Sequence, residues 1–133
     1  MPIDQESSAV ALARAHAEAW SHHDWDTARK MLAPDVHVTT TTTQPIMAGA
    51  ATELTGIDNY MDGLIKFAQA VEPGSARVIA SVGDEWNSLI LLTVRAAFGP
   101  DGEKVTLPAA RLALFDENHK LKKEQVVFFA VPD

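Results

Sequence analysis

The 133-residue chain contains no cysteine, which excludes disulfides, thiol nucleophiles and thiolate metal sites. Its longest strongly apolar stretch runs from Leu89 to Val94, far short of the roughly 20 residues that a membrane-spanning helix needs. Glycine-rich phosphate loops, dinucleotide-binding fingerprints and a spaced Ser-His-Asp set are also missing from the sequence. These absences argue against thiol-dependent enzymes, enzymes with glycine-rich nucleotide-binding loops and Ser-His-Asp hydrolases.

Basic residues are scarce compared with acidic ones. The chain has 11 lysines and arginines against 18 aspartates and glutamates, a formal net charge of −7. This balance argues against nucleic acid or an anionic membrane as a partner. The first eight residues include Asp4 and Glu6 but no basic residue, so we predict no secretory signal and a cytoplasmic protein.

The composition that remains is typical of a folded domain. Hydrophobic residues make up 47% of the chain and charged residues 22%, as in globular proteins. A chain of this length buries roughly two thirds of its unfolded surface and does not need disulfide bonds to be stable. We therefore predict a single domain over residues 1–133.

Three helices are predicted in the first half of the chain. The first begins at an Asp4 N-cap and ends near Ser21, and the second runs from Trp25, behind an Asp24 N-cap, to about Leu32 before Pro34. The third opens at residues 55–58 and ends at residues 73–74, with apolar side chains at helical spacing: Ile57, Tyr60, Leu64, Phe67 and Val71.

The rest of the chain reads as strands. A β-branched segment from Val36 to Thr43 follows the second helix, and residues 44–55 are assigned to a short hairpin and a loop. Four further strands are predicted, separated by turn sequences: Ala76–Val82, Trp86–Phe98, Val105–Phe115 and Leu121–Val131. Consecutive hairpins form an antiparallel meander, so the fold class is α+β with the helices on one side of the sheet.

Several local motifs resemble one protein family. They are Ala-Trp-Ser-His-His-Asp-Trp-Asp at 19–26, Leu-Ala-Pro-Asp-Val at 32–36, Thr-Gly-Ile-Asp at 55–58 and Asp-Glu-Asn-His-Lys-Leu at 116–121. With the order of elements, they resemble the SnoaL-like polyketide cyclases and ketosteroid isomerases of the nuclear transport factor 2-like superfamily. The motifs are structural, so the resemblance indicates a fold better than a reaction.

The resemblance implies a cone-shaped fold in which a curved antiparallel sheet wraps around about three helices and encloses an apolar pocket. Members use such a pocket for isomerase, cyclase, dehydratase or epoxide hydrolase reactions, or only to bind a ligand. Many pair through the outer face of the sheet, so a homodimer is the expected assembly.

The steroid isomerase pattern does not carry over to this sequence. The family's general base falls on Thr40, its oxyanion-hole tyrosine on His16 and its protonated aspartate on Arg111. A threonine hydroxyl cannot take a proton from carbon at neutral pH, which disfavours the steroid isomerase mechanism. His16 could instead act as a general acid or base at the pocket mouth, or be a histidine at the edge of the core.

Arg111 is the most informative residue because it lies in an otherwise apolar or small stretch, residues 109–114. Strand alternation from Phe115 places it on the inward face, where an unpaired guanidinium would be very costly. Pairing across the 117–119 turn brings Glu124 about opposite Arg111. The two residues then either bind an anionic oxygen and move a proton, or form a structural ion pair.

The remaining site predictions concern the pocket lining. Trp20, Thr40 and Tyr60 are the candidate ligand contacts, although each has an ordinary structural explanation as a core or strand residue. The cluster of His22, His23, Asp24 and Asp26 lies in a turn and a helix cap, so we predict no metal site.

Two hypotheses follow. The first is a SnoaL-like enzyme, working without a cofactor on a small apolar carbonyl or polyketide-like molecule, with His16, Arg111 and Glu124 as catalytic residues. The second is a non-catalytic ligand-binding or dimerisation module of the same fold.

Overall fold

The computed structural model describes residues 7–42, 53–97 and 101–129. In these ranges the helices are α1 (Ser8–Ser21), α2 (Trp25–Lys30) and α3 (Ile57–Ala68). The strands are β1 (Leu32–Thr42), β2 (Glu53–Thr55), β3 (Arg77–Gly83), β4 (Asn87–Ala96), β5 (Val105–Phe115) and β6 (Leu121–Phe128). The predicted α+β class is confirmed.

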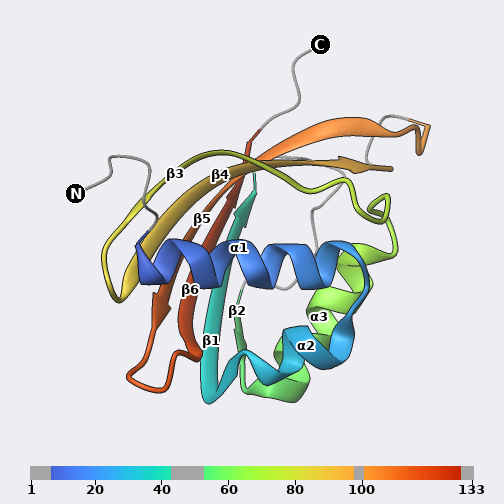
Figure 1. Ribbon diagram of the computed structural model, residues 1–133. Helices are drawn as coiled ribbons and strands as arrows, with labels where there is room; N and C mark the ends of the chain where they lie inside the picture. Colours follow the sequence, from blue (N-terminus) through green and yellow to red (C-terminus); the bar gives the residue numbers. More distant parts are fainter. Residues whose placement is uncertain (1–6, 43–52, 98–100, 130–133) are drawn as a thin grey trace.

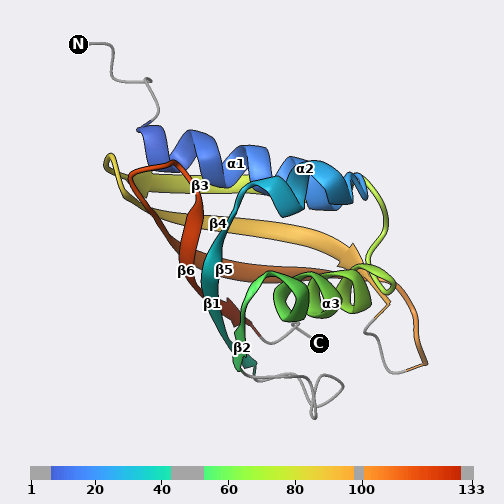
Figure 2. The same cartoon turned by 90° about the horizontal axis from the view of Figure 1, so that it is seen from below.

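The six strands form one sheet in the order β2-β1-β6-β5-β4-β3. Strands β3 to β6 make the predicted antiparallel meander, β1 runs parallel to β6, and β2 pairs antiparallel with β1. Figure 1 shows the strands curving behind α1, with α2 and α3 at one end. The view from below places α1 and α3 on the same side of the curved sheet (Figure 2). This is the predicted arrangement of a curved sheet around three helices.

Two helix starts have side-chain caps. The Ser7 hydroxyl accepts a hydrogen bond from the backbone N–H of Val10 at 3.1 Å, which caps α1. The predicted Asp4 cap lies outside the described residues. Asp24 caps α2 as predicted, accepting from the backbone N–H of Thr27 at 3.3 Å.

Two predicted helix ends are wrong. Helix α2 ends at Lys30, and Pro34 lies exposed inside β1 rather than stopping the helix. The β1–β6 register is irregular between Leu32 and His37, and such an irregularity tolerates a residue without an N–H donor. Helix α3 ends at Ala68, before the predicted Pro73-Gly74 stop.

The core lies between the helices and the concave face of the sheet. Strands β4 and β5 alternate buried and more exposed residues, as expected for strands with one covered face. Helix α1 turns Ala9, Ala13 and Ala17 inward, and these small side chains let its backbone lie close to the sheet. Five polar residues are buried among the described residues: His16, Ser21, Ser88, Arg111 and Glu124.

No helix in the described ranges combines the length and the apolar character needed to cross a membrane.

Candidate functional site

Arg111 points into the interior of the fold, as the strand alternation predicts. It lies on β5, where Ala109, Ala113 and Phe115 are also buried, and only 4% of its surface is exposed. Successive side chains of a strand point to opposite faces, so this position commits the guanidinium to the core. A charged group there requires partners from the protein or from a ligand.

Glu124 provides the first partner, although the predicted strand register is wrong. Arg111 lies opposite Val126, and Glu124 lies opposite Ala113, two residues from the predicted pairing. The register shifts between Leu114 and Phe115, next to the turn. This irregularity displaces β6 along β5 relative to the predicted pairing. Because side chains alternate with a period of two, this offset keeps Glu124 on the inward face.

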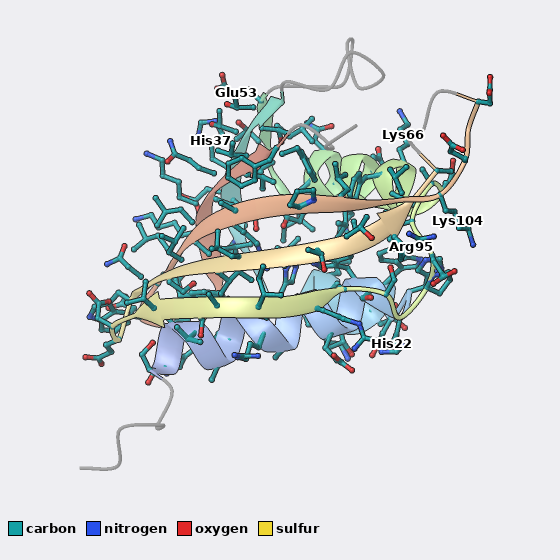
Figure 3. All side chains as sticks on the ribbon, turned by 90° about the horizontal axis from the view of Figure 1, so that it is seen from above. His22, His37, Glu53, Lys66, Arg95 and Lys104 are labelled. Atoms are coloured by element: carbon teal, nitrogen blue, oxygen red, sulfur yellow. The ribbon has the colours of Figure 1, made fainter. Side chains whose placement is uncertain are left out.

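The two side chains form a buried ion pair that Tyr60 completes. The Arg111 Nε atom donates a hydrogen bond to Glu124 Oε2. The Tyr60 hydroxyl, on α3, donates to Glu124 Oε1 at 2.8 Å. The other ion pairs among the described residues are partly or largely exposed, such as His37 with Glu53, 3.0 Å apart near one end of the sheet (Figure 3).

His16 comes to the same cluster from α1. Arg111 Nη2 lies 2.7 Å from His16 Nδ1, and Arg111 Nη1 donates to the Ala13 backbone carbonyl at 3.4 Å. The exposed fraction of His16 is 0%, so it lies deeper than the predicted position at a pocket mouth. We call His16, Tyr60, Arg111 and Glu124 the buried polar cluster.

One atom of the buried polar cluster has no partner. His16 Nε2 is buried and makes no hydrogen bond; the only other such side-chain atom in the described parts of the chain is Ser88 Oγ. Unpaired buried polar atoms are uncommon because each loses its hydrogen bonds to water. His16 Nε2 is thus a buried polar atom whose hydrogen-bonding capacity the described residues do not use.

Burial and neighbouring charges set the protonation of the buried polar cluster. Burial, reinforced by the Arg111 guanidinium, holds the pKa of His16 well below its ordinary value. Burial and the Glu124 carboxylate raise the pKa of Tyr60 well above its ordinary value. Burial lowers the pKa of Arg111, but the attraction of Glu124 and Tyr60 outweighs it and the net change is upward. Near neutral pH the cluster therefore holds a neutral imidazole, a neutral phenol and a guanidinium.

The other predicted ligand contacts lie apart from these hydrogen bonds. Trp20 is 6% exposed and packs edge-on against Phe67, with ring centroids 6.3 Å apart, as a core residue. Thr40 is half-buried on β1 opposite Val126, on the same strand face as Val36 and Val38. Their roles as ligand contacts stay predictions, and so does the apolar pocket.

The turn after α1 shows ordinary surface chemistry. A hollow of about 310 Å³ lies there, lined by residues from α1, the turn and α2: Ala15, Glu18, Ala19, His22, Asp24 and Thr27. His22 pairs with Glu18 at 3.1 Å and His23 stacks on Trp25. The described residues include no group of three or more His, Asp or Glu side chains that could hold a metal ion.

Sequence reasoning did not find the bond between Tyr60 and Glu124. The sequence predicts Tyr60 as a ligand contact because it lies on the apolar face of its helix. The signal that could have found the bond is chemical, since a buried tyrosine hydroxyl usually has a hydrogen-bond partner. The contact between Ala13 and Arg111 carries no such signal, because any residue has a backbone carbonyl.

A family model described as a SnoaL-like domain matches residues 13–123, which is more than half of the chain. The chain belongs to the SnoaL-like domain family. The match covers three of the four residues of the cluster, and the fourth, Glu124, directly follows its end. No curated protein matches the sequence.

Solved structures share the SnoaL-like fold at low sequence identity. A candidate SnoaL-like polyketide cyclase from Shewanella putrefaciens is 16% identical, with a TM-score of 0.74 over 93% of this chain and 81% of that one. A hypothetical protein with a ketosteroid isomerase-like fold from Catenulispora acidiphila, solved with trimethylamine, is 12% identical, with a TM-score of 0.68 over 86% and 82%. An NTF2-like protein of unknown function from Cytophaga hutchinsonii is 13% identical, with a TM-score of 0.68 over 95% and 94%. These likenesses establish the fold of this SnoaL-like domain.

Proposed function

We propose that this SnoaL-like domain is a cofactor-independent enzyme that moves a proton next to the carbonyl group of a small, largely apolar compound. The observation that carries the proposal is His16 Nε2, which is buried without a partner. Through Arg111, His16 is linked to Glu124, the one acidic side chain that is buried in the described ranges. A substrate in an apolar pocket inside the cone would meet both groups.

Each group has a role in such a reaction. The Glu124 carboxylate takes the proton from the carbon next to the carbonyl, and the C–H electron pair moves to the carbonyl oxygen to form an enolate. His16 Nε2 binds that oxygen. The positive charge of Arg111 stabilises the Glu124 carboxylate before the transfer and the enolate oxygen after it. Returning the proton to a different carbon completes an isomerisation. Attack of the enolate carbon on a second carbonyl moves that carbonyl's π electrons to its oxygen, and this oxygen takes the proton back from Glu124 to complete a cyclisation.

The Glu124 carboxylate can accept this proton although both oxygens already have partners. Tyr60 and Arg111 each use one lone-pair site, and a carboxylate offers about four. These bonds also hold the carboxylate in one orientation, which a positioned base requires.

The test is the exchange of α-protons in small cyclic ketones dissolved in D₂O, followed by proton NMR. We expect wild type to accelerate exchange, and Glu124→Gln to lower the accelerated rate by about 100-fold or more because it removes the base. Glu117→Gln, an exposed carboxylate in the β5–β6 turn, is the matched control and should exchange like wild type. Equal rates for wild type and Glu124→Gln would contradict the proposal.

A second candidate is a non-catalytic ligand-binding module. It is favoured by the saturation of the ion pair: all three Arg111 nitrogens and both Glu124 oxygens have protein partners. Thr40, where the isomerase pattern places a base, adds no carboxylate. This candidate predicts ketone binding without any acceleration of α-proton exchange.

A further inference from the structure

The hydrogen-bond donors around His16 restrict which of its nitrogens carries the proton. A guanidinium has only donors, so the 2.7 Å contact between Arg111 Nη2 and His16 Nδ1 requires Nδ1 to accept. In a neutral imidazole the proton then lies on Nε2. This is the nitrogen that is buried without a partner.

A doubly protonated His16 does not fit this arrangement. It would place an N–H donor of the ring against an N–H donor of Arg111 at 2.7 Å, with two positive charges in contact. The groups that face His16 are Arg111, which opposes its protonation, and Tyr60, whose ring centroid lies 6.0 Å from that of His16. Glu124, the nearest opposite charge in the cluster, is already bonded to Arg111 and Tyr60.

We infer that Arg111 is a positioning residue that holds His16 in the neutral tautomer with its proton on Nε2. The site then selects ligands that present a hydrogen-bond acceptor to this atom. The ligand class rests on the proposed function, whereas the tautomer rests on the protein alone.

The rest of the buried polar cluster supports this role. Glu124 Oε2 accepts from Arg111 Nε, and the Ala13 carbonyl accepts from Nη1. With the contact between Nη2 and His16, all three nitrogens of the guanidinium have partners. Ala13 and His16 are on the same helix, three residues apart, and Arg111 therefore binds α1 at two points. The orientation of the His16 ring is set by packing and by this contact together.

The first experiment measures ring-nitrogen chemical shifts of His16 by NMR in protein labelled with ¹⁵N-histidine. The signal is assigned by its loss in His16→Gln. We expect a protonated Nε2, a bare Nδ1 and no titration between about pH 5 and pH 8. A protonated Nδ1, or titration in this range, would overturn the inference.

Two variants separate positioning from general structure. Arg111→Met with Glu124→Leu removes both charges together, a change that often preserves folding, and should let the Nδ1–H tautomer appear. Tyr60→Phe keeps the contact between Arg111 and His16 and should leave the tautomer unchanged. An unchanged tautomer in the double variant would overturn the role of Arg111.

The ligand requirement is tested with two probes of similar shape, cyclohexanone and methylenecyclohexane. Only the ketone presents an acceptor, so we expect wild type to bind it about tenfold more tightly, and the double variant to bind both alike. Equal binding by wild type would overturn the acceptor requirement. If the tautomer is as expected and cyclohexanone does not bind, the proposed function fails while the positioning role of Arg111 stands.

Discussion

At the residue scale, burying the Arg111 guanidinium in this position costs desolvation free energy. Its neighbours on the inward face of β5 are alanines and a phenylalanine, and replacing a buried ion pair with apolar side chains is often neutral or stabilising. Stability alone therefore gives little reason for a guanidinium here. Its contacts with Glu124 and His16 give a chemical reason under the proposed function, in which they orient the base and the hydrogen-bond donor.

His16 should make the stability of the protein depend on pH. Its folded pKa lies well below the ordinary value of 6.5, so in acid the unfolded chain binds a proton that the folded chain does not. The free energy of unfolding should fall as the pH drops below about 6.5, by up to about 1.4 kcal/mol per pH unit from this group. Urea denaturation at a series of pH values measures the slope.

The matched variant for this prediction is His16→Phe, which keeps an aromatic ring and removes the titration. Its stability should fall less steeply over the same pH range than that of wild type. Equal slopes for wild type and His16→Phe would show that His16 is not held neutral in the fold.

At the element scale, the start of α3 brings Tyr60 to Glu124. The backbone N–H of Gly56 donates to the Val36 carbonyl at 2.8 Å, and the N–H of Tyr60 donates to the Gly56 carbonyl at 3.0 Å. Gly56 has φ 88° and ψ 156°, a conformation that essentially only glycine adopts. The chain therefore leaves β2 and enters α3 through a bend that a side chain would strain.

Gly56→Ala should destabilise the protein by about 1–3 kcal/mol through backbone strain. The added Cβ would meet no other atom within 4 Å, so a steric clash contributes nothing to this cost. Asn59→Ala, at the same end of α3, removes one exposed hydrogen bond to the Thr55 carbonyl and should be milder. Thermal and urea denaturation compare the two. A Gly56→Ala protein as stable as wild type would refute the strain.

Strand alternation is the element-level feature that the sequence predicts best. The bounds of β5 agree with prediction at both ends, and the turn between β5 and β6 was located correctly. The offset at Glu124 and the course of β1 through Pro34 were not predicted. Both depend on register irregularities, which arise from how a strand fits its neighbour rather than from its own residues.

At the scale of the whole molecule, the outer face of the sheet carries a group of exposed apolar side chains. Leu89 pairs with Leu112, and Ala110 pairs with both Leu91 and Val127, so their side chains form one patch. The four larger side chains are 36–44% exposed. Contiguous exposed apolar surface often marks a protein–protein interface. We propose that two copies of the chain pair through this face.

Leu112→Lys should prevent this pairing, because it places a charge in the middle of the patch that pairing would bury. Sedimentation velocity should find a dimer for wild type and a monomer for the variant. Ala11→Lys makes the same charge change on an exposed position of α1, away from the sheet, and should stay dimeric. A monomeric wild type, or a dimeric Leu112→Lys, would rule out this interface.

The sequence by itself determined the order of elements, the absence of thiol chemistry and the inward direction of Arg111. These follow from local properties: propensity, turn residues, composition and the two-residue period of a strand. The tertiary structure alone decided that His16 meets Arg111 across 95 positions, that Tyr60 bonds Glu124 across 64, and that His16 Nε2 is left without a partner. Those contacts depend on how α1 and α3 pack against the curved sheet, and no local pattern encodes that packing.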